Sequence, residues 1–166
     1  MEVNSVDPNA VELVNKFLEK NEPPKQDANQ NLINALEEAQ SSGRRVWAQH
    51  SQTRCAPCFL FSRWIDDHRA VPEKDFVFLK VDDVRDKGSI EVARKITGGR
   101  NFGIPFVAIM DSKGEILIDS ESPMGNFGFP STFEDTPHLR KMILAGGTHL
   151  TERELDELMG SLLNNN

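Results

Sequence analysis

The sequence predicts an α/β domain in which a mixed central sheet is flanked by helices. Short apolar runs that begin near Val46, Phe76 and Pro105 alternate with segments whose apolar residues recur at helical spacing. The chain has 166 residues, of which 38% are hydrophobic and 27% charged, and this length and composition are typical of one soluble globular domain. We therefore expect one α/β domain with further helices at its two ends.

Two helices are predicted ahead of the first strand. The segment Ala10–Lys20 places its apolar residues on one stripe and ends before two prolines. A second helix follows a polar stretch and ends at Gly43, which is a typical residue for a helix C-terminus. The apolar face of this second helix comprises Leu32, Leu36 and Ala39. We expect residues 1–43 to form an N-terminal helical extension and residues 44–166 to form the main domain.

Four strands and two helices are predicted in the central part of the chain. Strands are indicated by short apolar or β-branched runs, and helices by apolar positions three or four residues apart. The last two strands are separated by a polar turn that contains Gly114, so we expect them to form an antiparallel hairpin. In chain order the expected elements are a strand Val46–His50, a helix Phe59–Arg69, a strand Phe76–Val81, a helix Gly88–Thr97, and strands Pro105–Met110 and Ile116–Ile118.

Beyond the hairpin the chain has a long stretch without periodicity and then two more helices. Glu121–Asp135 is rich in Gly, Pro and Phe. Its phenylalanines are expected to pack under the loop, or else to form an exposed patch that helps to select a partner. The next helix is predicted to have Thr136 as its N-cap and to end at Gly146. In the final helix Thr151 and Glu154 form a capping box. Its apolar stripe comprises Leu155, Leu158, Met159 and Leu162.

The charge balance and the lengths of the apolar stretches exclude some classes of function. Nineteen Lys and Arg residues stand against 26 Asp and Glu residues, which gives a net charge of −7. This acidic balance disfavours general nucleic-acid binding. The longest apolar stretches are too short to span a bilayer, so no stable membrane insertion is expected. The first residues have neither the basic region nor the apolar region of a secretory signal, and this leaves the compartment open.

The two cysteines of the chain, Cys55 and Cys58, lie at the junction between a predicted strand and a predicted helix. At this position the unpaired N–H groups and the dipole of the helix stabilise a thiolate at Cys55, and the adjacent Arg54 adds positive charge. One turn on, Cys58 can attack a mixed disulfide at Cys55 and so resolve it. Two alternatives are half of a metal site, although zinc requires four ligands, and a pair of buried thiols without a role.

The segment Arg45–Ser120 resembles the thioredoxin fold, in particular bacterial thioredoxin-like proteins with an N-terminal helical extension. The residues that carry the resemblance are the run Cys55-Ala56-Pro57-Cys58 and the later run Gly103-Ile104-Pro105. The resemblance implies that Pro105 is cis, lies against the cysteines and keeps metals off the thiols. It also implies that the backbone of Ile104 pairs with an extended substrate, with Ala56 and Pro57 beside it in the substrate-binding surface.

The chain departs from the family pattern at two positions that should modulate the reaction. Arg54 stands where the family usually has a tryptophan, and Gln49 stands where a buried acid often accepts a proton. We therefore expect the second thiol to lack its usual general base. A further possibility is that His50 approaches Cys55 and tunes its ionisation.

These observations predict thiol–disulfide exchange on protein substrates, with Cys55 as the nucleophile and Cys58 as the resolving thiol. Reduction is the favoured direction, because a proline directly before Cys58 resembles the reducing branch of the family. The expected partners are a protein with a disulfide or a dithiol and a second dithiol protein that exchanges electrons; no cofactor is required, and a monomer is expected. Similarity of the Phe-rich loop to those of secreted or periplasmic relatives favours a periplasmic or secreted location if a signal has been removed, and otherwise a cytoplasmic one.

Two other classes of function are also compatible with these residues. The fold could serve as a non-enzymatic binding module, with the cysteines in a static disulfide. Alternatively, the two thiolates could bind a soft ion such as Cu(I), as in a metallochaperone.

Overall fold

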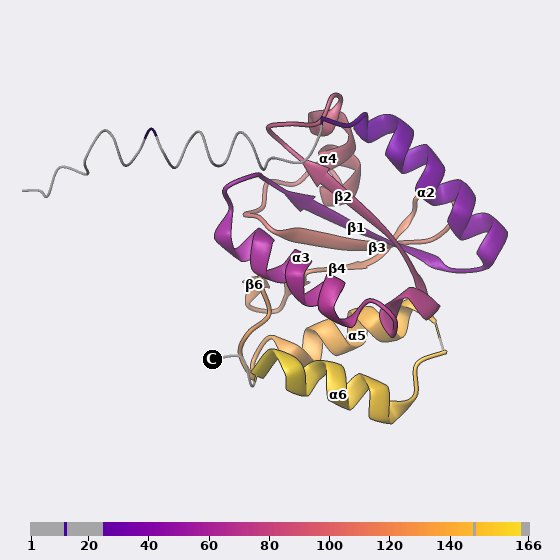
Figure 1. Ribbon diagram of the computed structural model, residues 1–166, viewed down its shortest axis with the longest axis vertical. Helices are drawn as coiled ribbons and strands as arrows, with labels where there is room; N and C mark the ends of the chain where they lie inside the picture. The colour runs from indigo at the N-terminus through magenta and orange to yellow at the C-terminus, as the bar shows by residue number, and fades with distance from the viewer. Residues whose placement is uncertain (1–11, 13–24, 148, 164–166) are drawn as a thin grey trace, which may run out of the picture.

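A four-stranded mixed sheet forms the centre of the molecule (Figure 1). The computed structural model describes residue 12 and residues 25–147 and 149–163. The strands lie in the order β2-β1-β3-β4, with β1 parallel to β2 and antiparallel to β3, and β3 antiparallel to β4. Their bounds are Arg45–Ser51 for β1, Phe76–Asp82 for β2, Phe106–Met110 for β3 and Ile116–Asp119 for β4. The predicted α/β class and the predicted antiparallel hairpin are confirmed.

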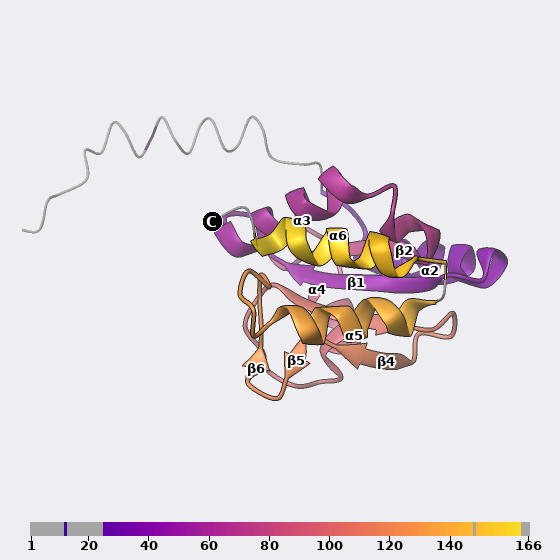
Figure 2. The ribbon, with the colours of Figure 1, turned by 90° about the horizontal axis from the view of Figure 1, so that it is seen from below.

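Helices cover both faces of the sheet, as Figure 1 shows. On one face, α2 (Ala28–Ser42) and α4 (Ser89–Thr97) pack against a buried cluster of residues from β1, β2 and β3. On the other face, α3 (Ala56–His68), α5 (Thr136–Gly146) and α6 (Glu152–Leu163) enclose a second cluster centred on Trp47. A short 3₁₀ helix, η1 (Pro72–Lys74), precedes β2. Figure 2 shows α5 and α6 side by side. Neighbouring residues of β1 reach opposite clusters, as the alternation of a strand requires.

The helix α2 has the boundaries that its sequence signals indicate. The Asp27 side chain accepts a hydrogen bond from the N–H of Gln30 at the N-terminus, and Gly43 ends the helix with a φ of 73°. Its apolar face is buried against the same cluster as β1 and β2. The predicted division of the chain into an N-terminal extension, residues 1–43, and a main domain, residues 44–166, stays a prediction. The helix predicted over Ala10–Lys20 lies outside the described residues, apart from Glu12.

The loop predicted over residues 121–135 contains a small hairpin that was not predicted from the sequence. β5 (Glu121–Ser122) pairs with β6 (Gly125–Asn126) in an antiparallel manner. Strands of two residues are too short to produce a detectable alternation, which explains the error. Phe127 and Phe129 are half-buried and pack against the cluster around Trp47, as one of the two expectations stated, whereas the side chain of Phe133 is 76% exposed.

The two C-terminal helices differ in how well their starts were predicted. α5 begins at Thr136 itself, with Asp135 as the N-cap residue. The prediction of Thr136 as the cap is wrong because its hydroxyl donates backwards to the carbonyl of Phe133. In α6 the capping box is confirmed: the Thr151 hydroxyl accepts the N–H of Glu154, and the Glu154 carboxylate accepts the N–H of Thr151. Among the described residues, no helix is both long and apolar enough to cross a membrane.

Candidate active site

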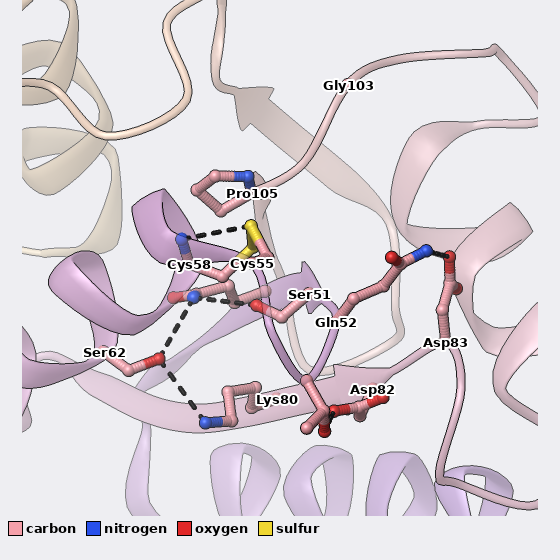
Figure 3. The surroundings of a disulfide bond; sticks show 12 residues. Ser51, Gln52, Cys55, Cys58, Ser62, Lys80, Asp82, Asp83, Gly103 and Pro105 are labelled. Carbon is pink, nitrogen blue, oxygen red and sulfur yellow. Dashed lines mark hydrogen bonds between the residues drawn. A yellow bond between two sulfur atoms is a disulfide. The ribbon is translucent and has the colours of Figure 1, made fainter. Parts of the chain in front are cut away.

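Cys55 and Cys58 form a disulfide at the N-terminus of α3 (Figure 3). Cys55 is the N-cap residue, and its Sγ accepts a hydrogen bond from the backbone N–H of Cys58 at 3.3 Å. Ala56 and Pro57 are the first two residues of the helix, and both are exposed. Pro57 fits this position because a proline in the first turn removes an N–H that has no partner within the helix. The start of the helix thus directs the N–H of Cys58 at the sulfur of Cys55.

The two sulfurs differ in accessibility. Cys55 is half-buried, whereas the side chain of Cys58 is 3% exposed. The difference follows from the helix, because Cys55 lies at its open end while Cys58 faces inward with Phe61 and Ile65. A bulky reaction partner can therefore reach Cys55 but not Cys58.

A cis proline lies beside the disulfide. The peptide bond between Ile104 and Pro105 is cis, and Figure 3 shows the ring of Pro105 facing the two cysteines. Pro105 is buried, and Ile104 before it is half-buried. The structure therefore brings together Cys55, Cys58 and Pro105 from segments that are about fifty residues apart in the sequence.

A hydrogen-bond network around the Gln49 amide lies on the β1 side of α3. The Gln49 side chain is 2% exposed, and its Nε2 donates to the hydroxyls of Ser51 at 3.0 Å and Ser62 at 3.3 Å. Lys80 Nζ donates to the same Ser62 hydroxyl at 3.4 Å. In Figure 3, Ser51, Ser62 and Lys80 lie on the side of the disulfide away from Pro105. Because an amide neither gains nor loses a proton near neutral pH, Gln49 cannot serve as a general base at this position.

Comparison with known protein families decides the assignment of this chain. The model of a family described as thioredoxin-like matches residues 27–112, which is just over half of the chain. The chain belongs to the thioredoxin-like family. The match begins with α2 and ends in the turn after β3, so it includes both cysteines and Pro105.

Two solved structures are similar to this chain at low sequence identity. A disulphide isomerase from Xylella fastidiosa Temecula1 superposes with a TM-score of 0.52 at 15% identity, covering 82% of this chain and 91% of that one. Thioredoxin O2 from Arabidopsis thaliana, in its oxidized state, gives a TM-score of 0.41 at 18% identity, covering 57% of this chain and 78% of that one. No curated protein sequence matches the chain.

The turn before Cys55 has an unusual backbone conformation at Arg54. Arg54 is exposed and has a φ of 75°, and it is the only non-glycine residue with a positive φ in the described part of the chain. The turn is held by Gln52, whose carbonyl accepts the N–H of Cys55 and whose side chain donates to Asp83. Thr53 also donates to Asp82. The backbone of Arg54 is therefore forced into a conformation that costs energy for any residue with a Cβ.

His50 has a partner other than Cys55. Its Nε2 pairs with the Asp83 carboxylate, and its side chain lines a small cavity with Ile90 and Phe102 that does not include Cys55. The possibility that His50 tunes Cys55 directly is therefore not supported. Its ring reaches the opposite face of the sheet from Trp47 because neighbouring side chains of β1 alternate.

A larger cavity of about 880 Å³ opens beside Cys55. It lies between α2 and α3 along β2, which is an edge strand of the sheet. Its apolar wall includes Ala35, Phe59 and Leu79. The cavity thus leaves open space next to the half-buried Cys55.

Ser51, Ser62 and Lys80 were not identified from the sequence, although one weak signal points to Ser62. Ser62 follows Cys58 by four residues, which places both on the same side of α3. Lys80 lies directly opposite Gln49 in the parallel pairing of β1 and β2. Recognising that pairing requires the register of the sheet, which the sequence alone does not provide. Among the described residues, no group of three or more His, Cys, Asp or Glu side chains is placed to hold a metal ion.

Proposed function

We propose that this protein is a thiol–disulfide oxidoreductase that acts on protein disulfides through Cys55 and Cys58. The observation that carries the proposal is the asymmetry of the pair. The accessible Cys55 sulfur accepts an N–H at the start of α3, whereas Cys58 is buried directly behind it. This arrangement favours a thiolate at the accessible position, because the helix N-terminus stabilises negative charge there.

The reaction takes place in two exchange steps. In the reduced protein the Cys55 thiolate attacks one sulfur of a substrate disulfide, forming a mixed disulfide and releasing the other substrate sulfur as a thiolate. Cys58 then loses its proton and attacks Cys55, which forms the intramolecular disulfide and releases the second substrate thiolate. The substrate gains two electrons and the cysteine pair loses two. A dithiol partner protein restores the reduced state by the reverse exchange.

The segment around the cis proline provides a surface for an extended substrate. No hydrogen bond is found for the N–H or the C=O of Ile104 within the described residues. A substrate strand can pair with these two groups in the manner of an added β-strand. Ala56 and Pro57, the two exposed residues directly after Cys55, extend the contact surface. Such recognition depends on main-chain atoms and therefore tolerates many substrate sequences.

Reduction is the proposed direction, and the reduction potential of the Cys55–Cys58 pair tests it. A potential near that of thioredoxin, about −270 mV, would support a reductase. A value close to about −120 mV would instead support an oxidase, because the protein would then take electrons from its substrates. Equilibration with glutathione buffers of known ratio, followed by quantification of free thiols, gives this value.

Reduction of insulin by dithiothreitol tests the proposed activity itself. The wild-type protein should accelerate the reaction, and Cys55→Ser should abolish the acceleration because the attacking sulfur is lost. Cys58→Ser should also lose catalytic turnover, because the mixed disulfide is no longer resolved within the protein. If the wild type does not exceed the Cys55→Ser variant, the oxidoreductase proposal fails, and a binding module that presents its exposed Met124 and Phe133 becomes the better account.

A further inference from the structure

The β5–β6 hairpin is joined to the cis-proline segment by a single amide side chain. Asn126, in β6, donates through Nδ2 to the carbonyl of Gly103 at 2.8 Å and to the carbonyl of Pro105 at 3.1 Å. These two carbonyls lie on either side of Ile104 in the chain. The hairpin therefore holds the cis-proline segment at two points rather than merely covering it.

The orientation of this amide is fixed by the groups on its other side. Oδ1 of Asn126 accepts the hydroxyl of Ser120 at 2.7 Å and the N–H of Gly128 at 3.4 Å. Ser120 is completely buried, and its hydroxyl also accepts the N–H of Val107 in β3 at 3.0 Å. The amide nitrogen donates to two carbonyls and the amide oxygen accepts from two donors. Exchanging the nitrogen and the oxygen would break these hydrogen bonds, so the orientation of the amide is defined.

The consequence for Ile104 follows from these hydrogen bonds. With the neighbouring carbonyls bound to Asn126, the segment 103–105 is fixed at both flanks of Ile104. The N–H and C=O of Ile104 itself have no hydrogen bond in the described part of the chain. Ile104 is half-buried rather than enclosed, so part of the residue is open to solvent.

We propose that Asn126 is a positioning residue for substrate binding: it holds the segment 103–105 so that the main chain of Ile104 is ready to pair with an extended protein substrate. This inference rests on the proposed oxidoreductase function and adds a residue to it. It also gives a role to the loop after β4. A fixed strand-like segment loses less conformational freedom when it binds, and substrate affinity should therefore depend on this amide.

The substitution Asn126→Asp tests the proposal with little change in side-chain size. It replaces the Nδ2 donor by an oxygen, so the carbonyls of Gly103 and Pro105 lose their partner and face a negative charge. The KM for insulin should rise about 10-fold, with kcat changed less than about twofold, because the lost interaction acts on binding. The rate at which dithiothreitol reduces the Cys55–Cys58 disulfide, and the reduction potential, should stay unchanged, because a small thiol needs no pairing with Ile104.

Two further variants separate positioning from charge and from folding. Asn101→Asp makes the same charge change at an exposed position in the segment that leads from α4 to Gly103, and its KM should equal that of the wild type. Asn126→Ala removes the donors without adding charge, and its KM should also rise.

The proposal is overturned if both Asn126 variants fold, judged by their circular dichroism, and keep the wild-type KM. It is equally overturned if they lose insulin reduction and dithiothreitol reactivity in parallel, since that pattern indicates general damage to the site. A wild-type protein without turnover would refute the oxidoreductase function, and this inference with it, whereas an active wild type with insensitive Asn126 variants would refute this inference alone.

Discussion

At the scale of single residues, the site combines features that a motif reveals with features that it does not. The sequence motif correctly placed Cys55 at the start of a helix, because the spacing of the pair and the change of periodicity are local signals. The left-handed backbone of Arg54 could not be predicted, because arginine has no preference for that conformation. The hydrogen bonds of the turn impose it.

Replacing Arg54 by glycine should therefore relieve strain. Arg54→Gly should have a free energy of unfolding about 1 kcal/mol higher than Arg54→Ala, because alanine retains the Cβ that makes a positive φ costly. Both variants lose the same charge, so the comparison isolates the backbone. Urea denaturation of the oxidised proteins measures the difference. Equal stabilities would show that the turn adapts to a Cβ without cost.

Gln49 gives a second prediction, in which a buried charge is introduced. Gln49→Asp should lower the free energy of unfolding at pH 7 by about 1–3 kcal/mol, because the ionised group would be buried beside the Ser51 and Ser62 hydroxyls. Burial should raise the pKa of the new carboxyl above its ordinary value of about 3.9. The loss of folding free energy should therefore grow as the pH rises above about 3.9, and it should vanish at lower pH, where the carboxyl is protonated in both the folded and the unfolded state. Urea midpoints relative to wild type at several pH values test this. A variant as stable as wild type at pH 7 would show that Lys80 compensates the charge.

At the scale of elements, the regular helices and strands were predictable, while short or irregular ones were not. α2 and α6 carry caps and apolar stripes in their own sequences, and β1 and β3 are apolar runs. β5 and β6 have two residues each, and no local pattern specifies them. They exist because Ser120 and Asn126 find partners in β3 and in the cis-proline segment.

Gly146 and Gly160 both lie within helices, and replacing each by alanine should have opposite effects on stability. A Cβ at Gly146 in α5 would collide with the ring of Phe76, which is fully buried. Gly146→Ala should therefore cost about 1–3 kcal/mol of folding free energy. Gly160 in α6 has open space around the Cβ position, so Gly160→Ala should gain about 0.5–1 kcal/mol from helix propensity. Thermal or urea unfolding of the two variants decides the matter; the same sign for both would contradict the packing argument.

The Glu154 carboxylate gives a pH-dependent prediction for the start of α6. Lys74 and the backbone N–H of Thr151 donate to it, and these contacts lower the pKa of Glu154 from its ordinary value of 4.5. A carboxylate with a depressed pKa stabilises the folded state above its ordinary value, and this contribution is lost as pH falls through the folded pKa. Glu154→Gln should thus lower the urea midpoint at pH 7 and match the wild type in strong acid.

The matched control for this prediction is Glu157→Gln in the same helix. Glu157 forms an exposed pair with Arg153 four residues earlier and caps nothing. Its neutralisation should change the free energy of unfolding by less than about 0.5 kcal/mol at any pH. A difference between wild type and Glu154→Gln that persists in strong acid would show that the effect does not come from the charge of Glu154.

At the scale of the whole molecule, the site is assembled from segments that the fold brings together. Cys55 follows β1, Pro105 precedes β3, and Asn126 belongs to a hairpin beyond β4. The motifs identified the first two, because each lies in a recognisable local run. Asn126 and Lys80 reach the site only through strand pairing and loop packing, and no spacing in the sequence encodes that proximity. The sequence therefore predicted the reacting atoms better than the residues that support them.

The most direct test of the central claim is to trap the mixed disulfide between this protein and a protein substrate. Reduced Cys58→Ser is mixed with insulin, quenched with acid and measured by mass spectrometry, with Cys55→Ser as the matched control. We expect a covalent adduct that peptide mapping places on Cys55 in the first variant, and little or none in the second, because Cys58 is buried. Adducts of equal yield in both variants, or none in either, would contradict it.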